Sequence, residues 1–265
     1  MSVATETHAR RRSPRLSVRR SPLAQLTITE FRLFTREPLV FFWGIIFPLL
    51  LLVIFGLIPS FKETHPGYQG LTVLETYVPI IIVTMLALLS FFSLPVTLAT
   101  YREQRILRRL QTTPAGPARV LTAQLAVTVS AAAVMVTAIL VLGRLAFAVP
   151  FPEAPGIWVV VALLTAACTL SLGLLIAAIA PNPRVAAATG NILFFPLMFF
   201  SGLWLPIPSM PEMLQHISHA TPLGAAWESF QAADLGHWPP ALALGTMAAY
   251  AIAFGLAAAR LFRWE

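Results

Sequence analysis

The sequence is poor in charged residues, in lysine and in cysteine. Asp, Glu, Lys and Arg make up 11% of its 265 residues, whereas 57% are hydrophobic; soluble domains carry roughly 25% charged residues. Such a chain cannot cover its surface with polar groups, which excludes an ordinary soluble domain and indicates folding in a lipid bilayer. Lys62 is the only lysine and Cys168 the only cysteine, so there is no disulfide framework and no Cys-x-x-Cys metal site.

Sequence motifs for catalysis are also missing. The chain has no G-x-x-x-x-G-K-[ST] phosphate loop, no H-E-x-x-H and no G-x-S-x-G. Its five histidines are scattered; His216 and His219 share one face of a short helix, which we interpret as surface-facing residues in preference to a metal pair. We therefore expect no catalytic residue, no metal site and no cofactor bound by this chain.

The net charge of +7 has a simpler explanation than nucleic-acid binding. In membrane proteins, basic residues collect in the loops that remain in the cytoplasm. We therefore exclude nucleic acid as a partner.

Six apolar runs predict an all-α polytopic membrane protein. Each run is near the roughly 20 residues that a helix needs to cross a bilayer, and the alternating pattern of barrel strands is absent. The first run exceeds a signal-peptide core and has no cleavage pattern after it, so we interpret it as a retained span. The predicted spans are 39–58, 77–100, 120–142, 157–180, 185–205 and 241–261.

Two segments precede the first span. Residues 1–22 are rich in Arg and Ser without an apolar period, which predicts a disordered basic tail. Residues 23–37 place Leu26, Phe31 and Phe34 on one helical face, opposite Arg32 and Arg36. This pattern is typical of a helix that lies in the membrane interface.

Arginine positions predict the orientation. With the N-terminus inside, 16 of the 18 Lys and Arg residues fall in the tail, the interfacial helix, the even-numbered connections or the C-terminus, and the two exceptions are Lys62 and Arg144. The positive-inside rule therefore places both termini in the cytoplasm.

The connection after the second span, residues 101–124, is basic and too short for a domain. Arg102–Gln111 can form about three helical turns, with Ile106, Leu107 and Leu110 on one side and Thr113-Pro114 as the stop. A short, half-apolar helix of this kind can seat in a partner's groove; the alternative is a solvated positive loop.

The outer connection, residues 206–240, is punctuated by Pro206, Pro208 and Pro211 and contains no Lys or Arg. Ser201-Gly202 ends the aromatic run before it. Amphipathic periods over 210–219 and 223–233 predict two short helices, which we interpret as an outer gate.

A substrate path is a weaker inference from the second and fifth spans. Both are aromatic, and an amphiphile would use such surfaces, although each side chain could equally pack or face lipid. The candidates are Phe91, Phe92, Asn191, Phe194, Phe195, Met198 and Phe199. Asn191 is open between helix–helix hydrogen bonding and pore lining, and Gly173 and Gly190 are expected to permit close helix contact.

Over residues 23–265 the sequence resembles the type-2 permeases of ATP-binding-cassette (ABC) transporters, nearest to the daunorubicin-type drug exporters. The likeness rests on R-E-P before the first span, on an acidic residue, leucines and Thr-Pro after the second, and on F-x-S-G, Pro, Met-Pro and Pro-Leu around the fifth. Here these are Arg36, Glu37, Pro38; Glu103, Leu107, Leu110, Thr113, Pro114; and Phe199, Ser201, Gly202, Pro206, Met210, Pro211, Pro222, Leu223. Two departures are Arg105, near a common glycine, and Ala123-Gln124 in place of Gly-Lys.

The resemblance implies half of a transmembrane pore in a bacterial plasma membrane. A second copy or a paralogue would complete the pore, and two ATPase subunits would bind ATP and magnesium. The interfacial helix would be the connecting helix. Coupling to the ATPase would fall to Glu103, Arg105, Ile106, Leu107, Arg108, Arg109, Leu110, Thr113 and Pro114, and the outer gate to Ser201, Gly202, Pro206, Met210 and Pro211.

Four functions follow in order of preference. The first is ATP-driven export of a hydrophobic or amphiphilic compound, and the second is a flippase for a lipid or lipid-linked glycan. A channel or ATP-independent carrier is disfavoured because no span core contains Asp or Glu. A non-transporting membrane component is the fourth.

Overall fold

The computed structural model describes residues 42–64, 68, 70–106 and 116–262. The predicted tail (1–22), the interfacial helix (23–37) and residues 107–114 of the predicted coupling segment lie outside the described residues. Within them the chain is helical and forms no β-strand, apart from one isolated bridge between Thr64 and Thr72. The all-α prediction is confirmed.

Among the described residues, five helical stretches are long and apolar enough to cross a membrane: 73–103, 119–147, 155–179, 183–200 and 241–261. A shorter apolar helix, 42–57, precedes them. The helices are η1 (Phe42–Ile46), α3 (Phe47–Leu57), η2 (Pro59–Lys62), α4 (Val73–Leu88), η4 (Leu89–Ser93), α5 (Leu94–Glu103), α7 (Gly116–Phe147), α8 (Pro155–Ile179), α9 (Pro183–Phe200), η5 (Ile207–Ser209), α10 (Glu212–Ala220), α11 (Pro222–Asp234) and α12 (Ala241–Leu261).

Several helices begin at side chains that satisfy the first backbone N–H groups. At α4 the Thr72 hydroxyl accepts from the Glu75 N–H (3.2 Å), and the Glu75 carboxylate accepts from the Thr72 N–H (2.7 Å). This reciprocal pair is a capping box. Asn182 caps α9 through the Val185 N–H (2.9 Å). These caps fix the residues at which two of the spanning helices begin.

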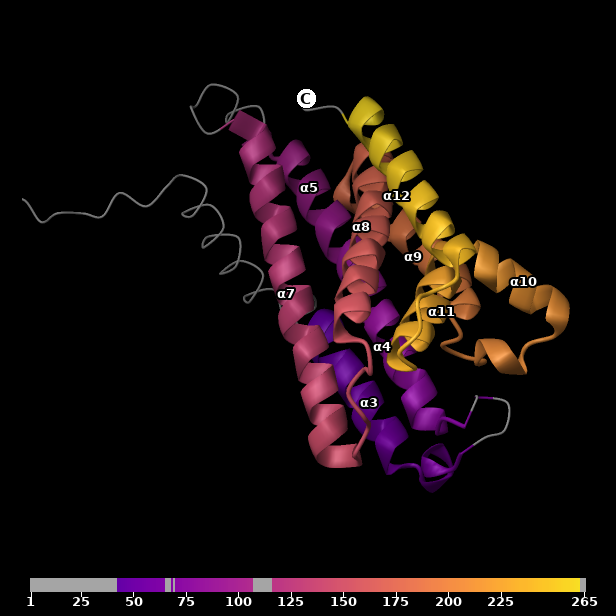
Figure 1. Cartoon of the computed structure of the whole chain (residues 1–265). Helices are drawn as coiled ribbons and strands as arrows, with labels where there is room; N and C mark the ends of the chain where they lie inside the picture. Colours follow the sequence, from indigo (N-terminus) through magenta and orange to yellow (C-terminus); the bar gives the residue numbers. More distant parts are fainter. Residues whose placement is uncertain (1–41, 65–67, 69, 107–115, 263–265) are drawn as a thin grey trace, which may run out of the picture.

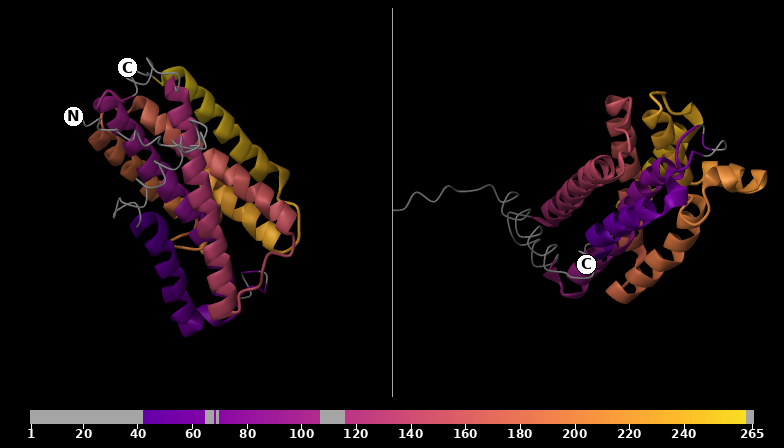
Figure 2. Two further views of the ribbon diagram at one scale, coloured as in Figure 1. Left: turned by 90° about the vertical axis from the view of Figure 1, so that its left-hand side faces the viewer. Right: turned by 90° about the horizontal axis from the view of Figure 1, so that it is seen from below.

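The continuous stretch α4–η4–α5 is the central helix of the bundle. It is mostly buried, with α8, α9 and α11 packed against it, while α7 runs along the opposite edge from α10 (Figure 1). Figure 2 shows α10 projecting from the side of the bundle. The outward faces of α7, α9 and α12 expose large apolar side chains such as Val134, Ile192 and Leu256, which suits contact with lipid.

Glycines let two helices approach the backbone of η4, as their sequence positions predicted. A Cβ built on Gly190 would lie 2.6 Å from the Phe91 carbonyl oxygen, and one on Gly173 would collide with the Ser90 carbonyl oxygen. η4 is a π-helical segment, a form that occurs mostly as a local bulge and frequently at functional sites. α8 and α9 are therefore held against this bulge by backbone contact.

Some predicted boundaries were wrong. α7 continues through Gly143 and Arg144 to Phe147, so the outer connection begins later than residue 143. The fifth span ends at Phe200 instead of 205, because the chain leaves the helix at Gly202, whose φ of +90° favours glycine.

The helix predicted over 102–111 was also wrong at its start. Arg102 and Glu103 are the last residues of α5, and the backbone turns at Gln104 and Arg105. Arg105 has a φ of +56°, a conformation that glycine adopts at no steric cost.

Candidate functional site

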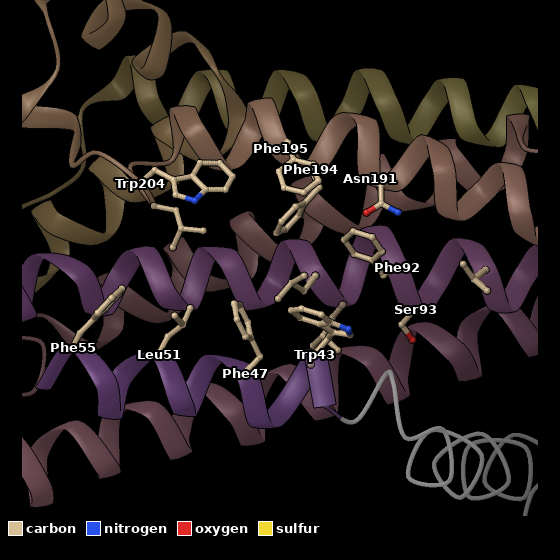
Figure 3. Close-up of a pocket in the computed structure, with 15 residues that line it drawn as sticks. Trp43, Phe47, Leu51, Phe55, Phe92, Ser93, Asn191, Phe194, Phe195 and Trp204 are labelled. Carbon is tan, nitrogen blue, oxygen red and sulfur yellow. The ribbon is translucent and has the colours of Figure 1, made fainter. Parts of the chain in front are cut away.

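An apolar groove of about 860 Å³ lies between α3 and α9, with the central helix behind it (Figure 3). We call it the aromatic groove. Seven of its 15 lining residues are aromatic and none is ionisable, so it suits an uncharged or amphiphilic molecule. The lining is Trp43, Gly44, Phe47, Leu51, Phe55, Leu88, Leu89, Phe92, Ser93, Val96, Asn191, Phe194, Phe195, Leu203 and Trp204.

One wall comes from η1 and α3. Trp43, Phe47, Leu51 and Phe55 recur every fourth residue, which places them on one helical face. The Trp43 and Phe47 rings lie 5.0 Å apart. Because Gly44 has no side chain, this helix comes close to Leu89, whose Cδ2 would lie 2.7 Å from a Cβ at Gly44.

The facing wall is a chain of rings. Phe92 meets Phe194 edge to face at 5.4 Å, Phe194 contacts Phe195 at 5.8 Å, and Phe195 stacks on Trp204 at 6.0 Å and 11°. Phe195 and Trp204 are each more than half exposed, at 57% and 52%. Much of the surface of these two rings therefore faces the groove and is not buried against other side chains.

The polar side chains of the groove are Ser93 and Asn191. The Asn191 amide donates to the Ala187 carbonyl of its own helix (2.9 Å), and the side chain is exposed beside the Phe92 ring (Figure 3). Of the two alternatives left open by the sequence, lining the groove agrees with this geometry, since the amide nitrogen donates to a carbonyl of its own helix.

The structure divides the predicted path residues. Phe92, Asn191, Phe194 and Phe195 come together in the groove. Phe91 and Met198 are fully buried in the core, and Phe199 contacts Phe200 at 5.3 Å outside the groove lining. The residues missed are Trp43, Phe47, Leu51 and Phe55; their spacing of four puts them on one helical face, but the helix is apolar on its other faces too.

The predicted outer-gate residues meet at the end of α9. Ser201 is buried and donates to the Met198 carbonyl (2.9 Å). Pro206 and Met210 are buried, whereas Pro211 is exposed. Met210 joins Ile207 and Trp227 in a cluster with Tyr77 and Ile80 of α4. The Trp227 indole N–H donates to the Thr76 carbonyl at 3.4 Å, so the short helices are fastened to the central helix.

At the other end of the bundle, Arg102 donates to the Ala180 carbonyl and so joins the ends of α5 and α8. Glu103 and Arg105 are exposed and Ile106 is half-buried. Leu107, Arg108, Arg109, Leu110, Thr113 and Pro114 lie outside the described residues, so their role in coupling stays a prediction.

Two histidines lie close to carboxylates in α10 and α11. His219 Nδ1 lies 2.7 Å from Glu228 Oε2, and His216 Nε2 lies 3.9 Å from Glu212 Oε1. In the part of the chain that the structure describes, no three His, Cys, Asp or Glu residues are grouped to hold a metal ion.

The helices of spanning length surround a groove that has no ionisable side chain in its lining. These features define a polytopic membrane protein with a groove that can accommodate an apolar molecule. The sequence profile described as ABC-2 type transporter matches residues 22–235, and the chain belongs to this family. It is also 31% identical over 91 residues to Nodulation protein J of Neorhizobium galegae, a match that covers 34% of this chain and 35% of that protein. The chain thus carries a membrane domain of the ABC-2 type transporter family. The matched segment spans about a third of this curated relative.

Proposed function

We propose that this chain is the permease subunit of an ATP-driven exporter that moves a hydrophobic or amphiphilic compound out of the cytoplasm or the inner leaflet. The observation that carries the proposal is the aromatic groove. Its volume of about 860 Å³ lies within the range of pockets that bury drug-sized ligands. An apolar lining with two polar side chains favours a molecule that carries few hydrogen-bonding groups.

We propose a bacterial plasma membrane with both termini in the cytoplasm. The arrangement of charge supports this orientation. Arg102, Arg119, Arg184 and Arg260 lie in terminal turns of α5, α7, α9 and α12 at one end of the bundle (Figure 1). Lys62 and Arg144 lie at the opposite end, in η2 and the last turn of α7.

The proposed assembly contains two ABC ATPase subunits and a second permease, either an identical copy or a paralogue. ATP and Mg²⁺ would bind the ATPase, and this chain would supply neither phosphate loop nor catalytic residue. Membership of the ABC-2 family supports this division of labour. The segment around Glu103, Arg105 and Ile106 extends from the central helix, which also lines the groove, and so motion of the ATPase would reach the groove directly.

The test is reconstitution of the chain in proteoliposomes with its ATPase. We expect ATP-dependent movement of a fluorescent amphiphile such as an acylated rhodamine, and none when either subunit is omitted. A parallel arm carries a fluorescent phospholipid. Movement of the phospholipid alone would replace export by the flippase function, and ATP-dependent movement in neither arm would refute both.

A further inference from the structure

A second cavity, of about 400 Å³, lies between α10, α11 and the segment 235–240. We call it the outer pocket. It is separate from the aromatic groove, and its lining is much richer in polar groups. The side chains that matter here are Gln215, His219, Glu228, Gln231, His237 and Trp238. α10 stands away from the bundle at this point (Figures 1 and 2).

The floor of the pocket is rigid. Trp227 is 2% exposed, and its indole N–H is engaged by the Thr76 carbonyl of the central helix. Gln215 donates through its amide nitrogen to the Met210 carbonyl at 2.8 Å, so its amide oxygen is the group that it can offer to a ligand. The pocket is therefore built on side chains that are held in place before anything binds.

The charges of the pocket do not suit an ionic ligand. The whole connection 206–240 lacks Lys and Arg, so nothing there compensates a phosphate or a carboxylate. The carboxylate of the lining, Glu228, is already paired with His219 at 2.7 Å. The described residues hold no group of three metal-ligating side chains. The ligand that suits this pocket is therefore uncharged.

The polar side chains of the lining carry both donors and acceptors. An amide such as that of Gln231 offers both, and a neutral imidazole such as that of His237 offers one of either kind. His219 Nδ1 is engaged by Glu228, so its ring offers Nε2 alone. Hydroxyl groups likewise donate and accept, so a ligand with several hydroxyls matches this set.

The rim carries an exposed aromatic plane. Trp238 is 69% exposed, although its ring is large and apolar. The hydrogens along one face of a sugar ring can stack on such an indole, while the hydroxyl groups at the ring edge reach planar amide and imidazole groups. An aromatic platform beside paired donors and acceptors is thus suited to a sugar.

We propose that the outer pocket binds a neutral, hydroxyl-rich group of the sugar type, either free in the external solution or as the head group of a glycolipid. Binding at this pocket requires the external placement of 206–240 that we propose above, but it does not require transport. Failure of the transport experiment therefore leaves it standing.

The test uses the full chain in phosphatidylcholine nanodiscs, and saturation-transfer NMR as the readout. Maltotriose in solution is one probe; the other is a galactosyl diacylglycerol incorporated in the disc. We expect saturable transfer to the sugar protons in at least one arm. The arm that responds identifies the source as free sugar or glycolipid.

Two variants locate the binding. Trp238→Ala should weaken it by about three- to tenfold, from the value of one aromatic contact, and Gln231→Ala should weaken it to a similar degree. The matched control is His216→Ala, an exposed residue of α10 outside the pocket. It should bind as wild type. No saturable transfer in either arm, or equal binding by Trp238→Ala and wild type, would overturn the proposal.

Discussion

The contact between Gly190 of α9 and the backbone of η4 permits a quantitative prediction. A Cβ at Gly190 would lie 2.6 Å from the Phe91 carbonyl oxygen, whereas ordinary contacts begin at 3.4 Å. Gly190→Ala must therefore separate the two backbones by about 0.8 Å, the difference between these distances. A carbonyl in a buried helix cannot rotate away as a flexible side chain can, so the helices themselves must shift.

Overpacking of this kind costs roughly 1–3 kcal/mol. For a chain of this size each kcal/mol lowers the melting temperature by roughly 2–4 °C, so a cost of about 2 kcal/mol gives a fall of about 4–8 °C. Because α9 also carries Asn191, Phe194 and Phe195, the same shift changes the width of the aromatic groove. We expect transport to fall together with stability.

The assay is thermal melting of the detergent-purified protein, followed by fluorescence-detected size-exclusion chromatography. Gly245→Ala is the matched control, because a Cβ at this glycine of α12 meets nothing within 4 Å. Alanine there should be neutral or stabilise by about 0.5–1 kcal/mol through the lower entropy of the unfolded chain. If Gly190→Ala melts at the same temperature as Gly245→Ala, the close packing of α9 on η4 is refuted.

Three further predictions concern the outer helices and the ATPase. Burial raises the pKa of Asp234 from 3.8 to about 7; a hydrogen bond from Trp158 opposes this shift, and the charge of Glu75 adds to it. The stability of the protein should therefore fall as pH rises from about 4 to about 7, and Asp234→Asn should reduce this dependence of the melting temperature on pH. A melting temperature that depends on pH equally in the variant and the wild type would contradict this prediction. Gly202→Leu should lower transport because residue 202 has a φ of +90° and lies against Ile207, and wild-type transport would remove Gly202 from the outer gate. The double variant Leu107→Ala, Leu110→Ala should reduce co-purification of the ATPase more than Arg109→Ala does. Truncating an apolar interface anchor commonly costs over 1 kcal/mol of binding free energy. Normal retention of the ATPase by the double variant would contradict the coupling assignment.

Five of the six predicted spans coincide with helices of spanning length in the described residues, and the first coincides with the shorter apolar helix 42–57. Apolar runs of about 20 residues have few alternatives in a bilayer. It also predicts Gly202 as a helix stop and Gly173 and Gly190 as contact points. The turn at Arg105 was not predicted, since Arg102–Gln111 has continuous helical periodicity and a positive φ at an arginine has no local signal.

The sequence singled out residues of one wall of the aromatic groove and none of the other. Phe194 and Phe195 were named because the fifth span is conspicuously aromatic, and the structure places both in the groove lining. Trp43, Phe47 and Phe55 occupy one face of the first span, but an apolar face in a wholly apolar helix does not reveal whether it meets lipid, protein or a groove. Only the packing of α3 opposite α9 distinguishes these surroundings. For the same reason Phe91 and Met198, chosen with their neighbours, proved to be buried core.

The central claim is that cargo travels through the aromatic groove, and the measurement that tests it most directly is ATP-dependent transport by two variants of α9. Phe195 and Ile192 are both large exposed apolar residues of this helix, but only Phe195 lines the groove. Replacing either with alanine removes little buried packing, so both proteins should assemble with the ATPase and melt as wild type does. We predict that Phe195→Ala lowers transport of the fluorescent amphiphile or raises its apparent KM severalfold, while Ile192→Ala transports normally. Equal transport by the two variants, or a loss confined to Ile192→Ala, would contradict the assignment of the groove as the cargo path.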